Sequence, residues 1–108
     1  MGQYFYVANI DKKQFLHPHT FGDGLKLLEF GASGRGTMAA LALLLADNSD
    51  GDRWGDSPLI GSWCGDRIVV AGDYGPPDSS GESVHDQCSE EFEDISEVMR
   101  EVLDSQYD

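Results

Sequence analysis

Hydrophobic residues in this chain fall into a few short stretches, and each stretch predicts one element. Residues 3–10 (QYFYVANI) combine aromatic and β-branched residues, which predicts a strand. A turn at 11–13 and an extended piece at 14–16 then complete an expected hairpin. Residues 37–46 (TMAALALLLA) are apolar on every side, which predicts a helix buried at the centre of the domain.

The second half contains a weaker hairpin pattern and a clear helical stripe. Residues 59–64 and 67–71 flank a Gly65-Asp66 pair, which is typical of a tight hairpin turn. Residues 25–30 fit a strand or a short helix, and residues 17–19 are expected to stay extended because of Pro18. An amphipathic helix is predicted over 91–106, because apolar residues recur there at helical spacing. They are Phe92, Ile95, Met99, Val102 and Leu103.

These elements predict an α+β fold in one small domain spanning residues 1–108. The expected architecture is a small antiparallel sheet with one buried apolar helix and one acidic C-terminal amphipathic helix. Residues 1–75 are expected to form the core, and residues 76–108 an acidic linker followed by that helix. The segment 75–81 (GPPDSSG) has the composition of a linker.

Charge is distributed very unevenly along the chain. Of 108 residues, 20 are Asp or Glu and 7 are Lys or Arg, for a net charge of -13. Residues 1–46 hold three acids and four bases, whereas residues 47–108 hold the other 17 acids and three bases. This balance excludes direct binding of nucleic acid or of an anionic membrane through a basic patch. Acidity also favours solubility and is typical of salt-adapted organisms, so a housekeeping role in a salt-rich cytoplasm is an alternative.

The acidic positions of the predicted C-terminal helix are the main candidates for partner binding. They lie opposite the apolar stripe, and a row of carboxylates suits a basic protein surface. Trp54 is a further candidate contact, because it stands in a polar loop among charged residues and glycines. The candidate partner-binding residues are Glu90, Glu93, Glu97, Glu101, Asp104 and Trp54.

A glycine-rich loop before the apolar helix offers an alternative site for a small anion. The N–H groups at a helix N-terminus attract anions, and a neighbouring arginine adds positive charge. A tight entry to a buried helix is the favoured interpretation, because no P-loop lysine follows. The nucleotide-type alternative assigns ligand binding to Gly34, Arg35, Gly36 and Thr37.

The sequence contains few residues in patterns typical of metal binding or catalysis. His17 and His19 are weak metal candidates, since alternate residues of an extended strand share a face. No complete metal or catalytic motif is present, so we expect no cofactor and no enzymatic activity. Cys64 and Cys88 are expected to be free thiols, with a disulfide as the alternative. The apolar run 38–46 is too short to cross a bilayer, and we expect a cytoplasmic protein.

Roughly the first 75 residues contain three distinctive stretches, MGQYFYVANIDKKQFLHPHTFGDGLKLLEFG, GTMAALALLLAD and GSWCGDRIVVAGDY. These stretches resemble a family of short uncharacterised proteins from bacteria and their phages. The resemblance implies a phage or mobile-element context and assigns no activity or site residue. With the charge pattern, it leads to the expectation of a non-enzymatic inhibitor, such as an anti-CRISPR-like mimic of nucleic acid that blocks a basic groove.

Overall fold

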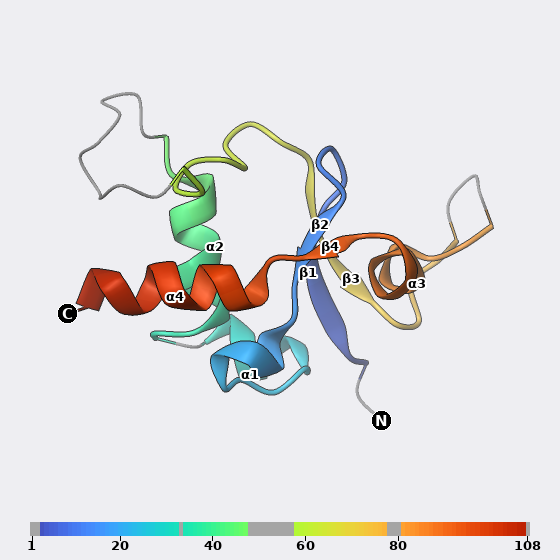
Figure 1. Cartoon of the computed structure of the whole chain (residues 1–108). Coiled ribbons are helices and arrows are strands. Elements are labelled where there is room, and N and C mark those ends of the chain that lie inside the picture. Colours follow the sequence, from blue (N-terminus) through green and yellow to red (C-terminus); the bar gives the residue numbers. More distant parts are fainter. Residues whose placement is uncertain (1–2, 33, 48–57, 78–80, 108) are drawn as a thin grey trace.

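The computed structural model describes residues 3–32, 34–47, 58–77 and 81–107. The strands are β1 (Phe5–Asn9), β2 (Gln14–Leu16), β3 (Ile68–Gly72) and β4 (Glu93–Asp94). The helices are η1 (Pro18–Phe21), α1 (Leu27–Gly31), α2 (Thr37–Leu45), α3 (Val84–Glu90) and α4 (Ser96–Tyr107) (Figure 1). The predicted α+β class is confirmed.

One four-stranded sheet organises the domain, with the strand order β3-β1-β2-β4. β1 is antiparallel to β2, as the hairpin expected at 11–13 requires, and it is also antiparallel to β3. β4 is parallel to β2, so the sheet is mixed and the expectation of a purely antiparallel sheet is wrong. The helix α3 lies between β3 and β4 and brings the chain across the sheet, so β4 reaches β2 without a hairpin.

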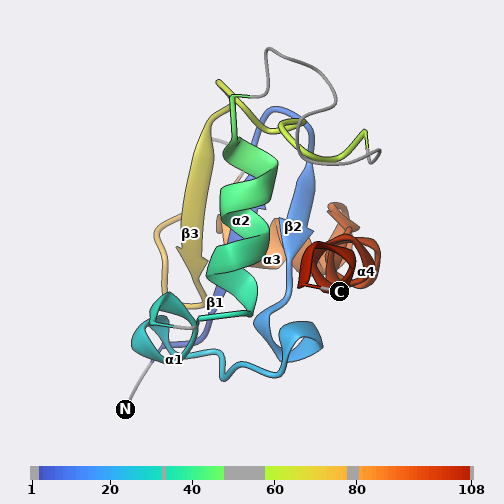
Figure 2. The ribbon, with the colours of Figure 1, turned by 90° about the vertical axis from the view of Figure 1, so that its left-hand side faces the viewer.

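Helices cover both faces of this sheet. Adjacent residues of a strand point to opposite faces, so Val7 and Ala8 of β1 belong to two different apolar clusters. Val7 packs with residues of α2 and α4, whereas Ala8 packs with Cys88 of α3. Figure 2 shows α2 in front of the strands and α3 behind them. The domain is therefore a sheet between helices, with α4 beside the β4 edge.

The C-terminal segment is part of the same core as residues 1–75. Ile95, Met99 and Leu103 are almost fully buried and pack in the cluster that contains Val7 and Leu16. Elements of 76–107 contact the rest of the chain at several places: α4 contacts η1 and α2, α3 contacts β1 and β3, and β4 contacts β2. Packing therefore continues across residue 75 and does not separate a core from a linker and helix.

The segment 59–64 is not a strand, so the expected second hairpin around Gly65 is wrong. It forms turns beneath the end of α2, where Gly61 N–H donates to Leu43 O and Trp63 N–H donates to Leu44 O, both at 2.9 Å. The last carbonyls of a helix lack partners within the helix, and these turns supply them. Trp63 is fully buried there, and its Nε1 donates to Gln14 Oε1 at 2.8 Å.

Two other local expectations need correction. α2 buries only one side, because Ala42 and Leu45 are exposed, so it covers the sheet and is not enclosed. Pro18 and His19 are not extended; they belong to η1, and only His17 before them keeps an extended backbone. Proline favours the first position of a helical turn, which explains this change of direction. The ambiguous stretch 25–30 ends as the short helix α1.

Candidate functional site: an acidic strip around one sheet edge

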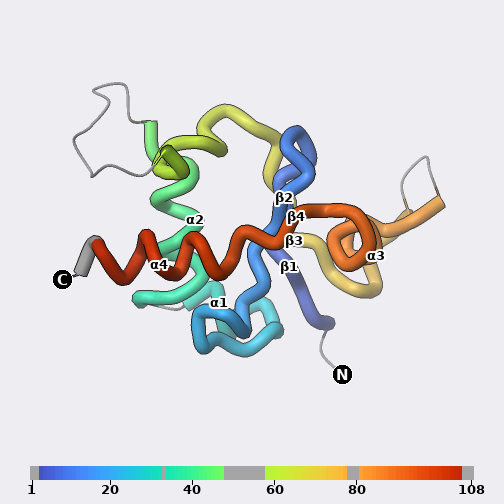
Figure 3. The backbone as a smooth tube through the Cα atoms, in the orientation of Figure 1, coloured from blue at the N-terminus to red at the C-terminus, as the bar shows by residue number. Residues whose placement is uncertain are grey.

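Exposed carboxylates follow the chain where it wraps around the β4 edge of the sheet. Figures 1 and 3 show the path, which runs from α3 on one face through β4 to α4 on the other. The strand order places this edge opposite β3, and Figure 2 shows β3 and α4 on opposite sides of β1 and β2. We define the acidic strip as Glu90, Glu91, Glu93, Asp94, Glu97, Glu101 and Asp104, all of which are exposed.

The strip begins at the C-terminal end of α3. Ser83 starts this helix, because its hydroxyl accepts a hydrogen bond from Asp86 N–H at 3.2 Å. Glu90 ends α3 and lies beside Glu82, and this contact raises the pKa of the Glu82 carboxyl. The main cause of the raised pKa is a hydrogen bond between the two carboxyl groups, and the negative charge of Glu90 adds to it.

The middle of the strip is the strand β4. The helix predicted over 91–106 is therefore wrong for its first residues, since α4 begins at Ser96. Glu93 N–H donates to Lys13 O at 2.9 Å and Ile95 N–H donates to Phe15 O at 3.1 Å, so these residues pair as a strand. Phe92 packs on the α3 face and Ile95 on the opposite face. A helix would place Phe92 and Ile95 on the same side. Because each of them is buried on a different face of the sheet, this segment is extended and the helix begins only after it.

The third part of the strip is the exposed side of α4. Glu97, Glu101 and Asp104 are spaced by four and three residues and therefore share one helix face, about 6 and 4.5 Å apart along the axis. Asp94 Oδ1 accepts from Ser96 N–H at 2.9 Å and stabilises the start of this helix. Arg100 partly offsets the charge, since its guanidinium lies 3.8 Å from Glu97.

The structure thus distributes the predicted carboxylates over three elements. Glu90 lies on α3, Glu93 lies on β4, and the other three lie on α4. Glu91 and Asp94 belong to the strip although the helical pattern did not include them. The Asp94-Ile95-Ser96 sequence before an apolar run was the available signal for a helix start. Trp54 lies outside the described residues.

The glycine-rich loop meets an internal carboxylate where a bound anion would lie. Thr37 N–H and Thr37 Oγ1 both donate to Asp23 Oδ2, at 2.8 and 2.7 Å. A Cβ at Gly36 would approach this oxygen to 2.4 Å, so glycine is required for the close approach. Asp23 therefore acts as the cap of α2, and this geometry favours a helix entry over an anion site. Gly34 and Arg35 are exposed on the same loop.

The metal candidates His17 and His19 lie in an aromatic cluster. Their ring centroids are 5.2 Å apart, and Tyr6 lies 5.0 Å from His17 and stacks on His85 at 4.2 Å. His17 Nδ1 accepts from His19 N–H at 3.3 Å, so a backbone group already uses that nitrogen. Among the described residues no group of three ligating side chains is placed to hold a metal ion.

The two cysteines differ in their exposure to solvent. Cys64 is exposed, whereas Cys88 is buried against the sheet, and both are free thiols, as predicted. Desolvation raises the pKa of the Cys88 thiol to about 12. Cys88 is therefore a structural residue, because a reactive cysteine needs an accessible thiolate.

None of the helices in the described part of the chain has the length and apolar character that crossing a bilayer requires. Comparison with family models, with curated proteins and with solved structures gives no match for this chain. Function therefore has to be argued from the site itself, which defines a small α+β protein with one acidic sheet edge.

Proposed function

We propose that the protein is a non-enzymatic inhibitor of the anti-CRISPR-like type, whose acidic strip occupies a cationic, nucleic-acid-binding groove of a partner protein. The observation that carries this proposal is the continuity of the strip. Seven exposed carboxylates follow one edge of the domain from α3 to α4. A groove that binds a phosphate backbone presents lysine and arginine along a similar path.

The distribution of the cations supports the same proposal. Lys12 and Arg67 are paired with Asp66 and Asp11 near the β1–β2 turn, so these two cations do not offset the strip. Arg100 lies on α4 beside the strip, and its positive charge is paired with Glu97 of the strip. The uncompensated charge would accelerate association with a basic partner and make it sensitive to salt.

The strip is also held in a fixed shape. β4 is anchored by the backbone hydrogen bonds of Glu93 and Ile95, and α4 is anchored by the buried side chains of Met99 and Leu103. A pre-ordered surface loses little conformational entropy on binding, which favours tight association over a given contact area. A flexible acidic tail would lack this advantage.

The proposal is tested with two variants of equal net charge. The first carries Glu97→Gln, Glu101→Gln and Asp104→Asn, which together raise the net charge by three. The control carries Ala42→Lys, which adds one positive charge, and Asp47→Lys, which reverses one, so it raises the net charge equally. Ala42 and Asp47 are exposed, and they lie on α2 and shortly after it, outside the three elements that carry the strip.

Each protein is immobilised and used to capture nucleic-acid-binding proteins from a bacterial lysate, with duplex DNA as competitor. The wild type and the control should retain a partner that both high salt and duplex DNA release, whereas the strip variant should lose it. Circular dichroism confirms that all three are folded. Equal capture by the strip variant, or capture that duplex DNA does not affect, would contradict the proposal.

A further inference from the structure

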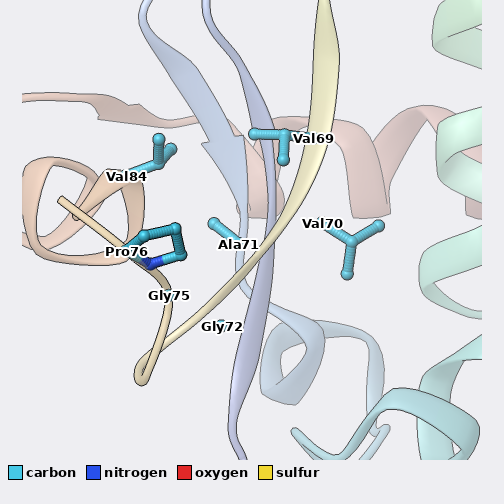
Figure 4. A pocket seen from close by; sticks show the side chains of 7 residues that line it. All are labelled: Val69, Val70, Ala71, Gly72, Gly75, Pro76 and Val84. Carbon is cyan, nitrogen blue, oxygen red and sulfur yellow. The ribbon is translucent and has the colours of Figure 1, made fainter. Parts of the chain in front are cut away.

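α3 is packed on the sheet less tightly than the helices on the other face. The cluster beneath it is the smaller of the two apolar clusters. An apolar hollow of about 200 Å³ adjoins this contact, and Figure 4 shows Val84 of α3 on one side of it and Val69 and Ala71 of β3 on the other. Apolar atoms beside an unfilled space lose the contacts that tight packing provides. α3 is therefore held less firmly than α2 and α4.

The three histidines of the chain lie in one cluster where α3 contacts β1. His85 of α3 stacks on Tyr6 of β1 with ring centroids 4.2 Å apart, and Tyr6 also contacts His17 at 5.0 Å. His19 of η1 lies 5.2 Å from His17. Histidine is the side chain that ordinarily changes charge between pH 5 and pH 8. Weak acid therefore brings like charges together at the contact that holds α3.

A positive charge on His17 is disfavoured while α3 is in place. Burial lowers the pKa of His17 from the ordinary 6.5, and the charges of His19 on η1 and His85 on α3 lower it further. Asp94 on β4 opposes these effects, and Tyr6 on β1 carries no charge in this range. Moving α3 away removes His85 from the cluster and lessens the burial of His17. The open form then binds a proton at a higher pH, so a falling pH favours opening.

The acidic groups of α3 act in the opposite direction. A hydrogen bond from Glu90 raises the pKa of Glu82, and the negative charges of Glu91 and Asp86 add to this effect. Protonation of Glu82 in acid therefore eases repulsion around α3 and holds the helix in place. These carboxyl groups lie at the solvated surface of α3, where charge interactions are weak. The partly buried histidine cluster beneath the helix therefore decides the direction.

We propose that α3 is an acid-sensitive cover, which protonation of the histidine cluster releases from the sheet between about pH 7 and pH 5. The release is local, because backbone hydrogen bonds of Glu93 and Ile95 fix β4 and because α4 is packed in the other cluster. Opening one weakly held element costs less free energy than unfolding the domain. Cys88, which α3 buries against the sheet, becomes accessible in the open form.

Release of α3 would also divide the acidic strip. Glu90 and Glu91 move with α3, whereas the other members of the strip stay on β4 and α4. The strip is then continuous at neutral pH and interrupted in weak acid, which would weaken binding of a cationic partner. Only this consequence rests on the proposed function. The opening itself is measured on the isolated protein, so its test does not depend on any partner.

The test uses Cys88 as a reporter in a Cys64→Ser background, which leaves no other thiol. The rate of labelling by a pyridyl disulfide is measured at pH 7 and pH 5. Protection is the rate in the urea-denatured protein divided by the rate in the folded protein at the same pH, which cancels the titration of the exposed thiol. Protection of Cys88 should fall roughly tenfold from pH 7 to pH 5, within the limit of about thirtyfold that one histidine of ordinary pKa 6.5 can supply. Low concentrations of urea should change the rate at pH 5 only slightly, because local opening exposes little surface.

Two histidine variants connect the loss of protection to the cluster. His85→Phe keeps a ring stacked on Tyr6 and removes the charge from α3. His17→Asn keeps an acceptor for the His19 N–H and removes the titrating ring. Each variant should retain at pH 5 most of the protection that it has at pH 7. Circular dichroism at both pH values shows that the variants are folded.

Two aspartate variants test the sign of the effect. Asp94→Asn removes a negative charge that stabilises protonated His17 in the closed form, so it should enlarge the loss of protection. Asp104→Asn makes the same change at an exposed position of α4 and should leave the loss unchanged. A charged His85 stacked on Tyr6 would by itself hold α3 in place. A rise in protection at pH 5, an undiminished loss in both histidine variants, or a steep dependence on urea would overturn the proposal.

Discussion

Asp23 and Thr37 are joined by two hydrogen bonds to the same carboxylate oxygen, and these bonds connect the turn after η1 to the first residue of α2. A carboxylate at a helix N-terminus satisfies an N–H group without a partner and interacts favourably with the helix dipole. The glycine-rich loop between the two residues brings them together, since Gly36 leaves room for the carboxylate.

Asp23→Ala should therefore lower the free energy of unfolding by about 1–2 kcal/mol, the usual cost of losing a helix cap. Urea denaturation followed by circular dichroism measures the change. Asp104→Ala removes the same charge from an exposed position of α4 and should change stability by less than about 0.5 kcal/mol. Equal effects of the two substitutions would mean that Asp23 acts only through its charge.

Met99→Ala should destabilise the whole domain by about 2–5 kcal/mol, because Met99 is fully buried in the main core. A single cooperative transition at lower urea concentration is expected, observed alike by circular dichroism and by tryptophan fluorescence. Val98→Ala, at the exposed neighbouring position, should have little effect. Two separate transitions in the Met99 variant would show that 76–108 unfolds independently of the rest.

The two thiols should differ strongly in reactivity. At pH 8 a thiol reagent such as Ellman's reagent should label Cys64 rapidly in the folded protein and Cys88 only after denaturation, because Cys88 is buried and its pKa is raised to about 12. Cys64→Ser should remove the rapid phase, and Cys88→Ser should leave it unchanged. Rapid labelling of both thiols in the wild type would contradict the placement of α3 on the sheet.

His17 should make stability depend on pH between about 7 and 5. Burial lowers its pKa from the ordinary 6.5, the positive charges of His19 and His85 lower it further, and Asp94 opposes them. The unfolded chain therefore binds a proton at a higher pH than the folded one. The stabilisation is complete above pH 6.5, the pKa of the unfolded chain, and is lost as the pH falls from there through the lower pKa of His17 in the folded protein.

His17→Asn keeps an acceptor for the His19 N–H and removes the titrating ring. Its unfolding free energy should fall less than that of the wild type between pH 7 and pH 5, as measured by urea denaturation at each pH. Comparing the two proteins cancels the contribution of the acidic side chains, which they share. Parallel pH profiles would exclude His17 as the titrating group.

Local sequence determined which segments form the first strands and the apolar helix. The hairpin of β1 and β2 follows from β-branched and aromatic residues, and the helix α2 follows from alanine and leucine, although its burial on every side does not. The free state of both thiols was likewise predicted. In these cases a residue's own properties and its nearest neighbours were sufficient.

The tertiary structure decided where the apolar residues of the C-terminal segment pack. Phe92 and Ile95 fit one helical stripe in the sequence, but the sheet offers two faces to cover, and each residue covers a different one. The helix therefore begins at Ser96, and β4 pairs in parallel with β2. Such pairing joins residues about 80 positions apart, and no local pattern records it.

The acidic strip shows the same division between sequence and fold. The sequence determined that negative charge is concentrated in its second half, because composition is independent of conformation. Only the fold decided that Glu90, Glu93 and Glu97 follow one sheet edge on three different elements, since the position of a side chain on a surface depends on how the backbone beneath it packs. The hydrophobic burial of Phe92, Met99 and Leu103 is the force that places these charges where they are.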